Sequence, residues 1–180
     1  MQRIFLFSFL MICNIALHAQ KCYTKNGNIS FYSKASIENI SADNGQVMST
    51  LDIQSGQLQF SVLIKAFHFK KSLMEQHFNE DYMESDKFPK ATFKGNLQEK
   101  IDLSKDGNYN VNVSGDMMIH GVTKNITAAG TITVKDGIAS AKATFKITLA
   151  DYKISIPAIV KDNIAKTVDV TVSCVYDKKM

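Results

Sequence analysis

Beyond the N-terminal segment that contains His18, three histidines, His68, His77 and His120, are the side chains best suited to hold a metal or to transfer protons. A zinc site built from three histidines is chemically possible. The predicted positions of the histidines argue against such a zinc site, because His77 falls in a segment of helical pattern whereas His120 lies on the polar face at a hairpin end. The sequence also lacks a Gly-x-Ser-x-Gly nucleophile motif, a His-Glu-x-x-His motif and a phosphate-binding glycine loop. We therefore predict no catalytic residues, no metal site and no cofactor, and so not an enzyme.

The N-terminal segment has the pattern of an export signal. Arg3 precedes an apolar run over residues 4–13, and small residues follow up to Ala19, after which cleavage is expected. We predict a signal peptide over residues 1–19, a single domain over residues 20–180, and a protein that is exported to the periplasm or secreted. The apolar run is shorter than the roughly 20 residues of a membrane-spanning helix. No second such run follows, so we predict no membrane span in the mature chain, with a signal anchor as the alternative.

The charged residues bear on which macromolecules the protein could bind, and the cysteines on whether it contains a disulfide. The mature chain would contain no arginine and no basic cluster, which argues against nucleic acid as a partner. Cys22 and Cys174 lie near the two ends of the mature chain. In an exported protein such a pair suggests a disulfide, and the alternative is two buried small apolar side chains. The sequence leaves the oligomeric state open, a dimer included.

Strict alternation of apolar and polar residues runs through most of the chain and predicts β-strands. About seven or eight antiparallel strands with short turns indicate an all-β barrel or sandwich. A single helix interrupts them, beginning at the capping-box pattern Ser72-Leu73-Met74-Glu75. Its apolar side carries Leu73, Phe78 and Tyr82, and we expect it to cap one end of the barrel.

The turns decide which residues face each other across neighbouring strands. In the stretch GDMMIHGVTKNIT, residues 115–127, a four-residue loop fits better than a two-residue loop at Val122-Thr123, because β-branched residues disfavour positive φ. The expected pairs are Gly115 with Gly130 across loop 121–124, Gly130 with Ala143 across Asp136-Gly137, Leu51 with Phe60 across loop 54–57, and Gly95 with Gly115 across loop 102–108.

These pairings place small residues side by side on the apolar face of four adjacent strands. One interpretation is an elongated apolar cavity, since an eight-stranded barrel is just wide enough to hold a small ligand. The other is mechanical, because strand glycines mark sharp bends and close approaches. For the cavity, the predicted ligand-binding residues are Phe60, Val62, Leu73, Phe78, Tyr82, Phe93, Gly95, Leu97, Gly115, Met117, Gly130, Ala141, Ala143 and Phe145.

Two segments resemble the YceI-like polyisoprenoid-binding proteins. The stretch from Gly115 to Lys124, GDMMIHGVTK, is similar to the family pattern Gly-x-Leu-Thr-Ile-x-Gly-Val-Thr-Lys, and HF, YME and FPKATF within residues 77–93 match a second family segment in order and spacing. The resemblance implies a lipocalin-like antiparallel barrel in the bacterial periplasm that holds an isoprenoid or similar long apolar molecule. Residues 149–153, LADYK, depart from the family pattern Arg-x-Asp-Phe-Gly.

The resulting functional prediction is non-catalytic binding, sequestration or transport of a long-chain apolar ligand, an isoprenoid or another lipid. The alternative is a solid barrel that binds a protein partner. For that alternative the interaction segment would be residues 150–166, which are unusually apolar for a connection of this length.

Overall fold

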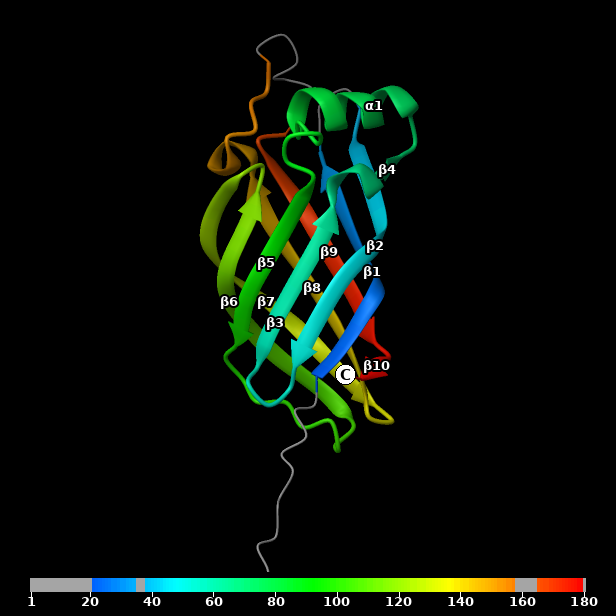
Figure 1. The fold of residues 1–180 in the computed structure, drawn as a ribbon, viewed down its shortest axis with the longest axis vertical. Coiled ribbons are helices and arrows are strands. Elements are labelled where there is room, and N and C mark those ends of the chain that lie inside the picture. The colour runs from blue at the N-terminus through cyan, green and yellow to red at the C-terminus, as the bar shows by residue number, and fades with distance from the viewer. Residues whose placement is uncertain (1–20, 35–37, 158–164, 180) are drawn as a thin grey trace, which may run out of the picture.

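The computed structural model describes residues 21–34, 38–157 and 165–179, so the predicted signal peptide lies outside the described residues. Ten strands form one antiparallel sheet in the order β10-β1-β9-β8-β7-β6-β5-β3-β2-β4, and pairing of β1 with β2 closes it into a barrel (Figure 1). Because β4 and β10 have two residues each, the barrel wall consists of eight strands, as predicted. The strands are β1 (Lys21–Ser33), β2 (Ile40–Asp52), β3 (Gln57–Leu63), β4 (His68–Phe69), β5 (Lys90–Leu97), β6 (Gly107–Ile119), β7 (Val122–Lys135), β8 (Ile138–Thr148), β9 (Thr167–Tyr176) and β10 (Lys178–Lys179).

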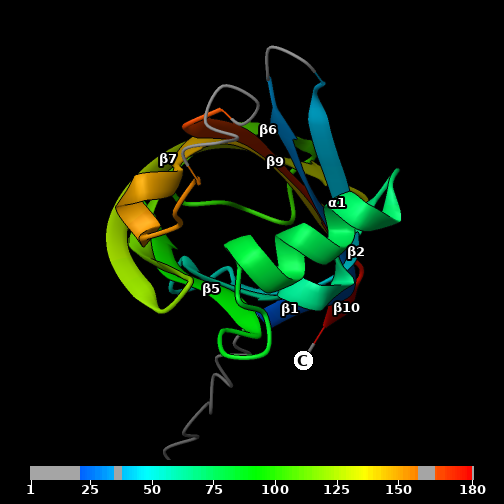
Figure 2. The same ribbon diagram turned by 90° about the horizontal axis from the view of Figure 1, so that it is seen from above.

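The helical segments gather at one end of the barrel, which we call the helical end. They are the 3₁₀ turn η1 (Ile64–Ala66), helix α1 (Ser72–His77), the π-helical turn η2 (Phe78–Tyr82) that continues it, and the 3₁₀ turn η3 (Leu149–Tyr152). Viewed from above, α1 and its continuation η2 lie on one side of the ring of strands, and η3 lies on the opposite side (Figure 2).

Helix α1 begins without the predicted capping box. Ser72 is its first helical residue. The N-cap residue is Lys71, whose side chain makes no capping hydrogen bond. The Glu75 carboxylate instead accepts a hydrogen bond from the backbone N–H of Phe69 at 3.1 Å. Glu75 therefore connects the start of the helix to β4 and does not form the capping-box hydrogen bond within the first turn.

The turn between β6 and β7 lies two residues earlier than predicted. His120 and Gly121 form a two-residue turn with φ of +50° and +72°, which is the type I′ geometry that suits a hairpin. Gly115 consequently faces Ile126, and Gly130 faces Val111, so the predicted Gly115–Gly130 pair is wrong. The partner of Gly115 moves by an even number of residues, so the inward face of both strands is still the predicted one.

Two other predicted registers are confirmed. Asp136 and Gly137, with φ of +52° and +73°, form a two-residue turn that places Gly130 opposite Ala143. Across the longer loop that follows β5, Gly95 faces Gly115. The small residues are therefore adjacent in two separate pairs, one between β5 and β6 and the other between β7 and β8, rather than in one continuous row.

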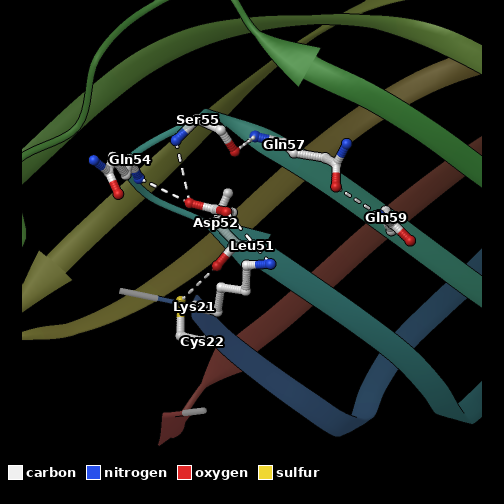
Figure 3. A network of polar contacts seen from close by, with 8 residues as sticks. All are labelled: Lys21, Cys22, Leu51, Asp52, Gln54, Ser55, Gln57 and Gln59. Carbon is white, nitrogen blue, oxygen red and sulfur yellow. Dashed lines mark hydrogen bonds and ion pairs between the residues drawn. The ribbon is translucent and has the colours of Figure 1, made fainter. Parts of the chain in front are cut away.

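The β2–β3 register differs from the prediction, since Leu51 faces Leu58 and not Phe60. Asp52 explains the difference, because its Oδ1 accepts hydrogen bonds from the N–H groups of Gln54 at 3.0 Å and Ser55 at 3.1 Å (Figure 3). Its carbonyl oxygen also accepts from the N–H of Gly56 at 2.8 Å. These bonds stabilise a four-residue turn over residues 53–56, one residue earlier than the predicted loop 54–57, so the partner of Leu51 lies two residues earlier in β3.

The end opposite the helices is packed solid and forms the floor of the barrel. Its fully buried residues include Leu51, Val134 and Tyr176, and the Tyr176 hydroxyl lies 2.9 Å from Ser49 Oγ. Cys22 and Cys174 are buried here, but no disulfide joins them. The Cys22 thiol lies 3.4 Å from the carbonyl oxygen of Leu51, to which it donates (Figure 3). The predicted disulfide is therefore absent, and the alternative of two buried apolar side chains describes the structure.

Candidate apolar binding cavity

An almost wholly apolar cavity of about 360 Å³ occupies the barrel between the floor and the helical end. This volume falls within the range of roughly 300–1,000 Å³ that is usual for small-molecule sites. Each strand of the wall presents every second residue to the interior. Most of the predicted ligand-binding residues line the cavity, namely Phe60, Val62, Phe78, Tyr82, Phe93, Leu97, Met117, Gly130, Ala141, Ala143 and Phe145.

The cavity exists because small residues replace large ones on the inward face of β7 and β8. Gly130, Ala141 and Ala143 form part of its wall and contribute little or no side-chain volume. Phe145, which also points inward, is only half-buried even though it lies among core residues. Since a filled barrel interior would bury such a ring completely, its exposed part faces unfilled space.

Gly95 and Gly115 have a different role from the one predicted, because neither lines the cavity. A Cβ atom at Gly95 would lie 2.5 Å from the carbonyl oxygen of Ser114 and 2.6 Å from the Phe93 ring. These two glycines allow β5 and β6 to approach closely and let the Phe93 ring fold over them. For this pair the mechanical interpretation holds. Ala143 suits the cavity interpretation, and Gly130 suits both, since it lines the cavity and a Cβ atom there would lie 2.8 Å from the carbonyl oxygen of Lys142.

The helical segments contribute only part of the predicted cap. Phe78 and Tyr82 of η2 line the cavity. Leu73 does not, since it is 60% exposed and points away from the barrel. The predicted grouping of Leu73 with Phe78 and Tyr82 on one side of the helix is therefore wrong for Leu73, because residues five positions apart, such as Leu73 and Phe78, point about 140° apart around a helix.

A cluster of four phenylalanines lies at the helical end, and only Phe78 is among the ligand-binding residues predicted from the sequence. The Phe78 ring packs on those of Phe31, Phe67 and Phe69, with centroids 5.6, 5.6 and 5.0 Å away. All four line the cavity. The alternation Phe67-His68-Phe69 is a signal that could have identified two of them, but it is too short to be recognised as a strand.

His120 links two segments of the helical end. Its Nε2 lies 3.1 Å from Glu84 Oε1, just beyond η2, and its Nδ1 lies 3.1 Å from the carbonyl oxygen of Tyr152 in η3. Both partners are acceptors, so a doubly protonated ring donates to both at once. The Phe88 ring packs edge-on against the imidazole with centroids 4.5 Å apart. The turn residue therefore holds the two sides of the helical end together.

The charged groups around the helical end are mostly paired and lie outside the cavity. Lys124 Nζ lies 2.7 Å from Asp151 Oδ1. Hydrogen bonds from Lys87 and then His120 lower the pKa of Glu84. Burial raises the pKa of Tyr82, and the neighbouring Asp81 adds to the effect. The Tyr82 hydroxyl is therefore neutral and suits the rim of an apolar site.

Among the described residues no three histidine, cysteine, aspartate or glutamate side chains come together as a metal-binding group. Each of the three histidines instead lies beside one carboxylate, of Glu75, Asp81 or Glu84. In the same part of the chain, no helix is long and apolar enough to cross a membrane.

Several solved structures share this architecture at low sequence identity. A polyisoprenoid binding domain from Saccharophagus degradans, implicated in plant cell wall breakdown, has a TM-score of 0.74 and 16% identity, with 88% of this chain and 97% of that chain covered. BcnA from Burkholderia cenocepacia has a TM-score of 0.69 and 15% identity, with coverages of 83% and 95%. The YCEI protein of Campylobacter jejuni has a TM-score of 0.51 and 18% identity, with coverages of 99% and 94%. These similarities concern the fold.

No curated protein matches this chain in sequence. The family model for the YceI-like domain, in contrast, matches residues 21–176. This range includes all eight strands of the barrel wall and the helical segments between them. The chain therefore belongs to the YceI-like domain family.

Proposed function

We propose that this protein binds a long-chain apolar ligand, an isoprenoid or another lipid, inside the barrel and sequesters or transports it without catalysis. The observation that carries the proposal is the apolar cavity of about 360 Å³ between the strands and the helical segments. The polyisoprenoid binding domain from Saccharophagus degradans, which shares the fold, supports the choice of ligand class.

Burial of the ligand's apolar surface would drive binding, at about 25 cal/mol for each Å² removed from water. The flexible chain of an isoprenoid or fatty acyl group suits a cavity walled by aliphatic and aromatic side chains. The four-phenylalanine cluster around Phe78 adds a flat aromatic surface at the helical end. Export to the periplasm or beyond is part of the proposal and rests on the N-terminal sequence pattern.

The alternative, a protein-binding segment over residues 150–166, has less support. Tyr152 and Ile154 are buried against the inner core, so these two apolar residues are not available to a partner. Residues 158–164 lie outside the described residues.

Equilibrium binding tests the proposed function directly. The mature protein should enhance the fluorescence of the apolar probe N-phenyl-1-naphthylamine, and farnesol and geranylgeraniol should displace it. Native mass spectrometry of protein purified from the exporting cell should detect a co-purified lipid. Protein that binds neither the probe nor the prenyl alcohols and carries no lipid would contradict the proposal.

A cavity-filling substitution gives a second test. Ala141→Phe adds an aromatic ring inside the barrel, where Ala141 lines the cavity, and it should abolish or strongly weaken prenyl alcohol binding. Val175→Phe is the matched control, because Val175 lies on the outer face of β9 and is 52% exposed. Circular dichroism should show that both variants are folded.

A further inference from the structure

The strands β7 and β8 separate halfway along their length. They pair from the turn, where Lys135 faces Ile138, up to Gly130 opposite Ala143. Beyond this point residues 122–129 of β7 and 144–148 of β8, all of them described, have no partner in the opposite strand. On their other sides, β7 pairs with β6 up to Val122 and β8 pairs with β9 up to Thr148. The wall of the barrel therefore has a seam that is closed near the floor and unpaired towards the helical end.

Hairpin geometry shows which peptide groups border this seam. In both two-residue hairpins the residues next to the turn exchange two hydrogen bonds, and such pairs then alternate along the strands. Even-numbered residues of β7 therefore direct their peptide groups to β6, whereas those of Thr127 and Ala129 point towards β8. On β8 the peptide groups of Thr144 and Lys146 point back towards β7. These polar groups form the edges of the unpaired seam, and they need water or a ligand as their partner.

The cavity reaches this seam and meets a hollow on the outer surface. The cavity wall includes Thr131 and Lys142, although the alternation places these side chains on the outer face. These two residues face each other in the paired part of β7 and β8, one position before the Gly130–Ala143 pair. The outer hollow is lined by the same two residues and, beyond that pair, by Ala129 and Thr144, the first residues of the seam without a partner in the opposite strand. The hollow therefore extends from the last paired positions into the start of the seam.

The outer hollow is polar, in contrast to the cavity behind it. Its rim includes Asn110, Asn112, Thr131 and Thr144, with the Lys142 ammonium as the one charged group among its lining residues. Lys142 forms none of the ion pairs found in the described part of the chain, whereas Lys146 on the same strand is paired with Asp169. Such a cation among hydrogen-bonding side chains suits an anionic group such as phosphate or carboxylate.

We propose that the ligand is amphipathic, with its chain in the cavity and an anionic head in the outer hollow beside Lys142, and that it passes through the β7–β8 seam. This inference rests on the proposed function. It adds that the head leaves the barrel sideways between two strands rather than through the helical end. The polar groups along the seam would then contact the region near the ligand's head, and the apolar interior would contact its chain.

Amide hydrogen exchange tests the seam without any ligand. In the ligand-free protein the amides of Thr127 and Ala129 should exchange rapidly, whereas those of Ile126 and Ala128, which bond to β6, should be protected. Addition of geranylgeranyl phosphate should slow exchange at Thr127 and Ala129. Equal protection of all four amides in the ligand-free protein would show a paired seam and would overturn the inference.

Binding of two prenyl ligands tests the head position. Wild-type protein should bind geranylgeranyl phosphate about tenfold or more tightly than geranylgeraniol, as expected for one charge-assisted contact. Lys142→Met should remove this preference, so that the ratio of the two affinities, measured in the same variant, falls to about one. Lys94→Met is the matched control, since Lys94 is an exposed lysine on β5, three strands away in the sheet, and it should keep the preference.

The outcomes separate this inference from the proposed function. If wild-type protein binds geranylgeraniol but Lys142→Met keeps the phosphate preference, the head position is wrong and the proposed function stands. If wild-type protein binds neither ligand, both are wrong. Inorganic phosphate at the same concentration should not displace geranylgeranyl phosphate, and displacement would mean that the hollow binds phosphate without the chain, which would overturn the inference.

Discussion

Gly115 on β6 lies directly opposite Gly95 on β5, and a Cβ atom at Gly115 would lie 2.3 Å from the Cα atom of Gly95. It would also lie 2.4 Å from the carbonyl oxygen of Lys94. Both contacts are with backbone, which cannot move aside as a flexible side chain can. The two glycines therefore fix how closely these strands pack at this point of the wall.

Gly115→Ala should destabilise the barrel by about 1–3 kcal/mol, because the added methyl forces the two strands apart. Urea unfolding followed by circular dichroism measures this change. Gly45→Ala is the control, since a Cβ atom at Gly45 would meet nothing within 4 Å, and its effect should stay within about 0.5 kcal/mol. Equal stabilities of the two variants would show that the close approach is unimportant.

His120→Asn isolates the contribution of the imidazole to the helical end. Asn-Gly is the most favourable sequence for a type I′ turn, so the hairpin itself should not suffer. The shorter side chain loses the contacts with Glu84 and with the carbonyl oxygen of Tyr152, which should cost about 1–2 kcal/mol.

Hydrogen exchange should locate the effect of His120→Asn. We expect faster exchange in residues 83–88 and 149–154, whereas the floor of the barrel stays protected. A uniform increase throughout the barrel would instead mean that His120 supports the whole fold. Unchanged exchange near Glu84 and Tyr152 would contradict the proposed link between the two sides of the helical end.

The β6–β7 turn also shows where sequence reasoning succeeds and where it stops. Alternation identifies the inward face of most strands of the barrel wall, because the side-chain period of two survives any even error in register. The exceptions are β1 and β2, where the buried positions change parity between Thr24 and Gly27 and between Asn44 and Val47. The choice of turn residues depends on a single backbone conformation, and His120 adopts positive φ although Asn, Asp and Gly are the usual residues there. The hairpin was therefore predicted, and its partner residues were not.

The cavity was predictable only in part for a related reason. Inward-facing small residues indicate missing volume, as at Gly130 and Ala143, but Gly95 and Gly115 look identical in the sequence and serve a close strand contact. At Gly130 a Cβ atom would also meet backbone, 2.8 Å from the carbonyl oxygen of Lys142, so only the three-dimensional packing shows which of these glycines line the cavity. The phenylalanines that contact Phe78 come from several separate segments of the chain, so no local sequence pattern predicts that they come together.

Asp52 should make the stability of the β2–β3 turn depend on pH. The hydrogen bond from the N–H of Ser55 is the largest cause that lowers the pKa of this carboxyl in the folded protein. Because the folded pKa is below the unfolded one, the stabilisation is present above about pH 4 and is lost as the pH falls through the folded pKa. Asp52→Asn keeps an acceptor oxygen and removes the charge, so it should cost about 0.5–1.5 kcal/mol at pH 7.

Urea unfolding of wild type and Asp52→Asn between pH 7 and about pH 3 tests this dependence. The difference between the two proteins should shrink as the pH falls. A difference that stays constant over this range would mean that the Asp52 charge does not contribute through its hydrogen bonds. Asp43→Asn is the comparison, because Asp43 is exposed and takes part in none of the side-chain hydrogen bonds or ion pairs found among the described residues.

The two cysteines at the floor of the barrel should be unreactive in the folded protein. Cys22 and Cys174 are 3% and 1% exposed, and burial raises the pKa of the Cys174 thiol to about 11. Since only the thiolate reacts with alkylating reagents, iodoacetamide at pH 8 should leave the native protein unmodified and should modify both residues in urea. Because the folded pKa is raised, the stability that Cys174 contributes is complete below about pH 9 and declines as the pH rises towards 11. Intact mass before and after reduction should be unchanged, whereas a shift on reduction, or full alkylation of the native protein, would contradict the buried reduced state.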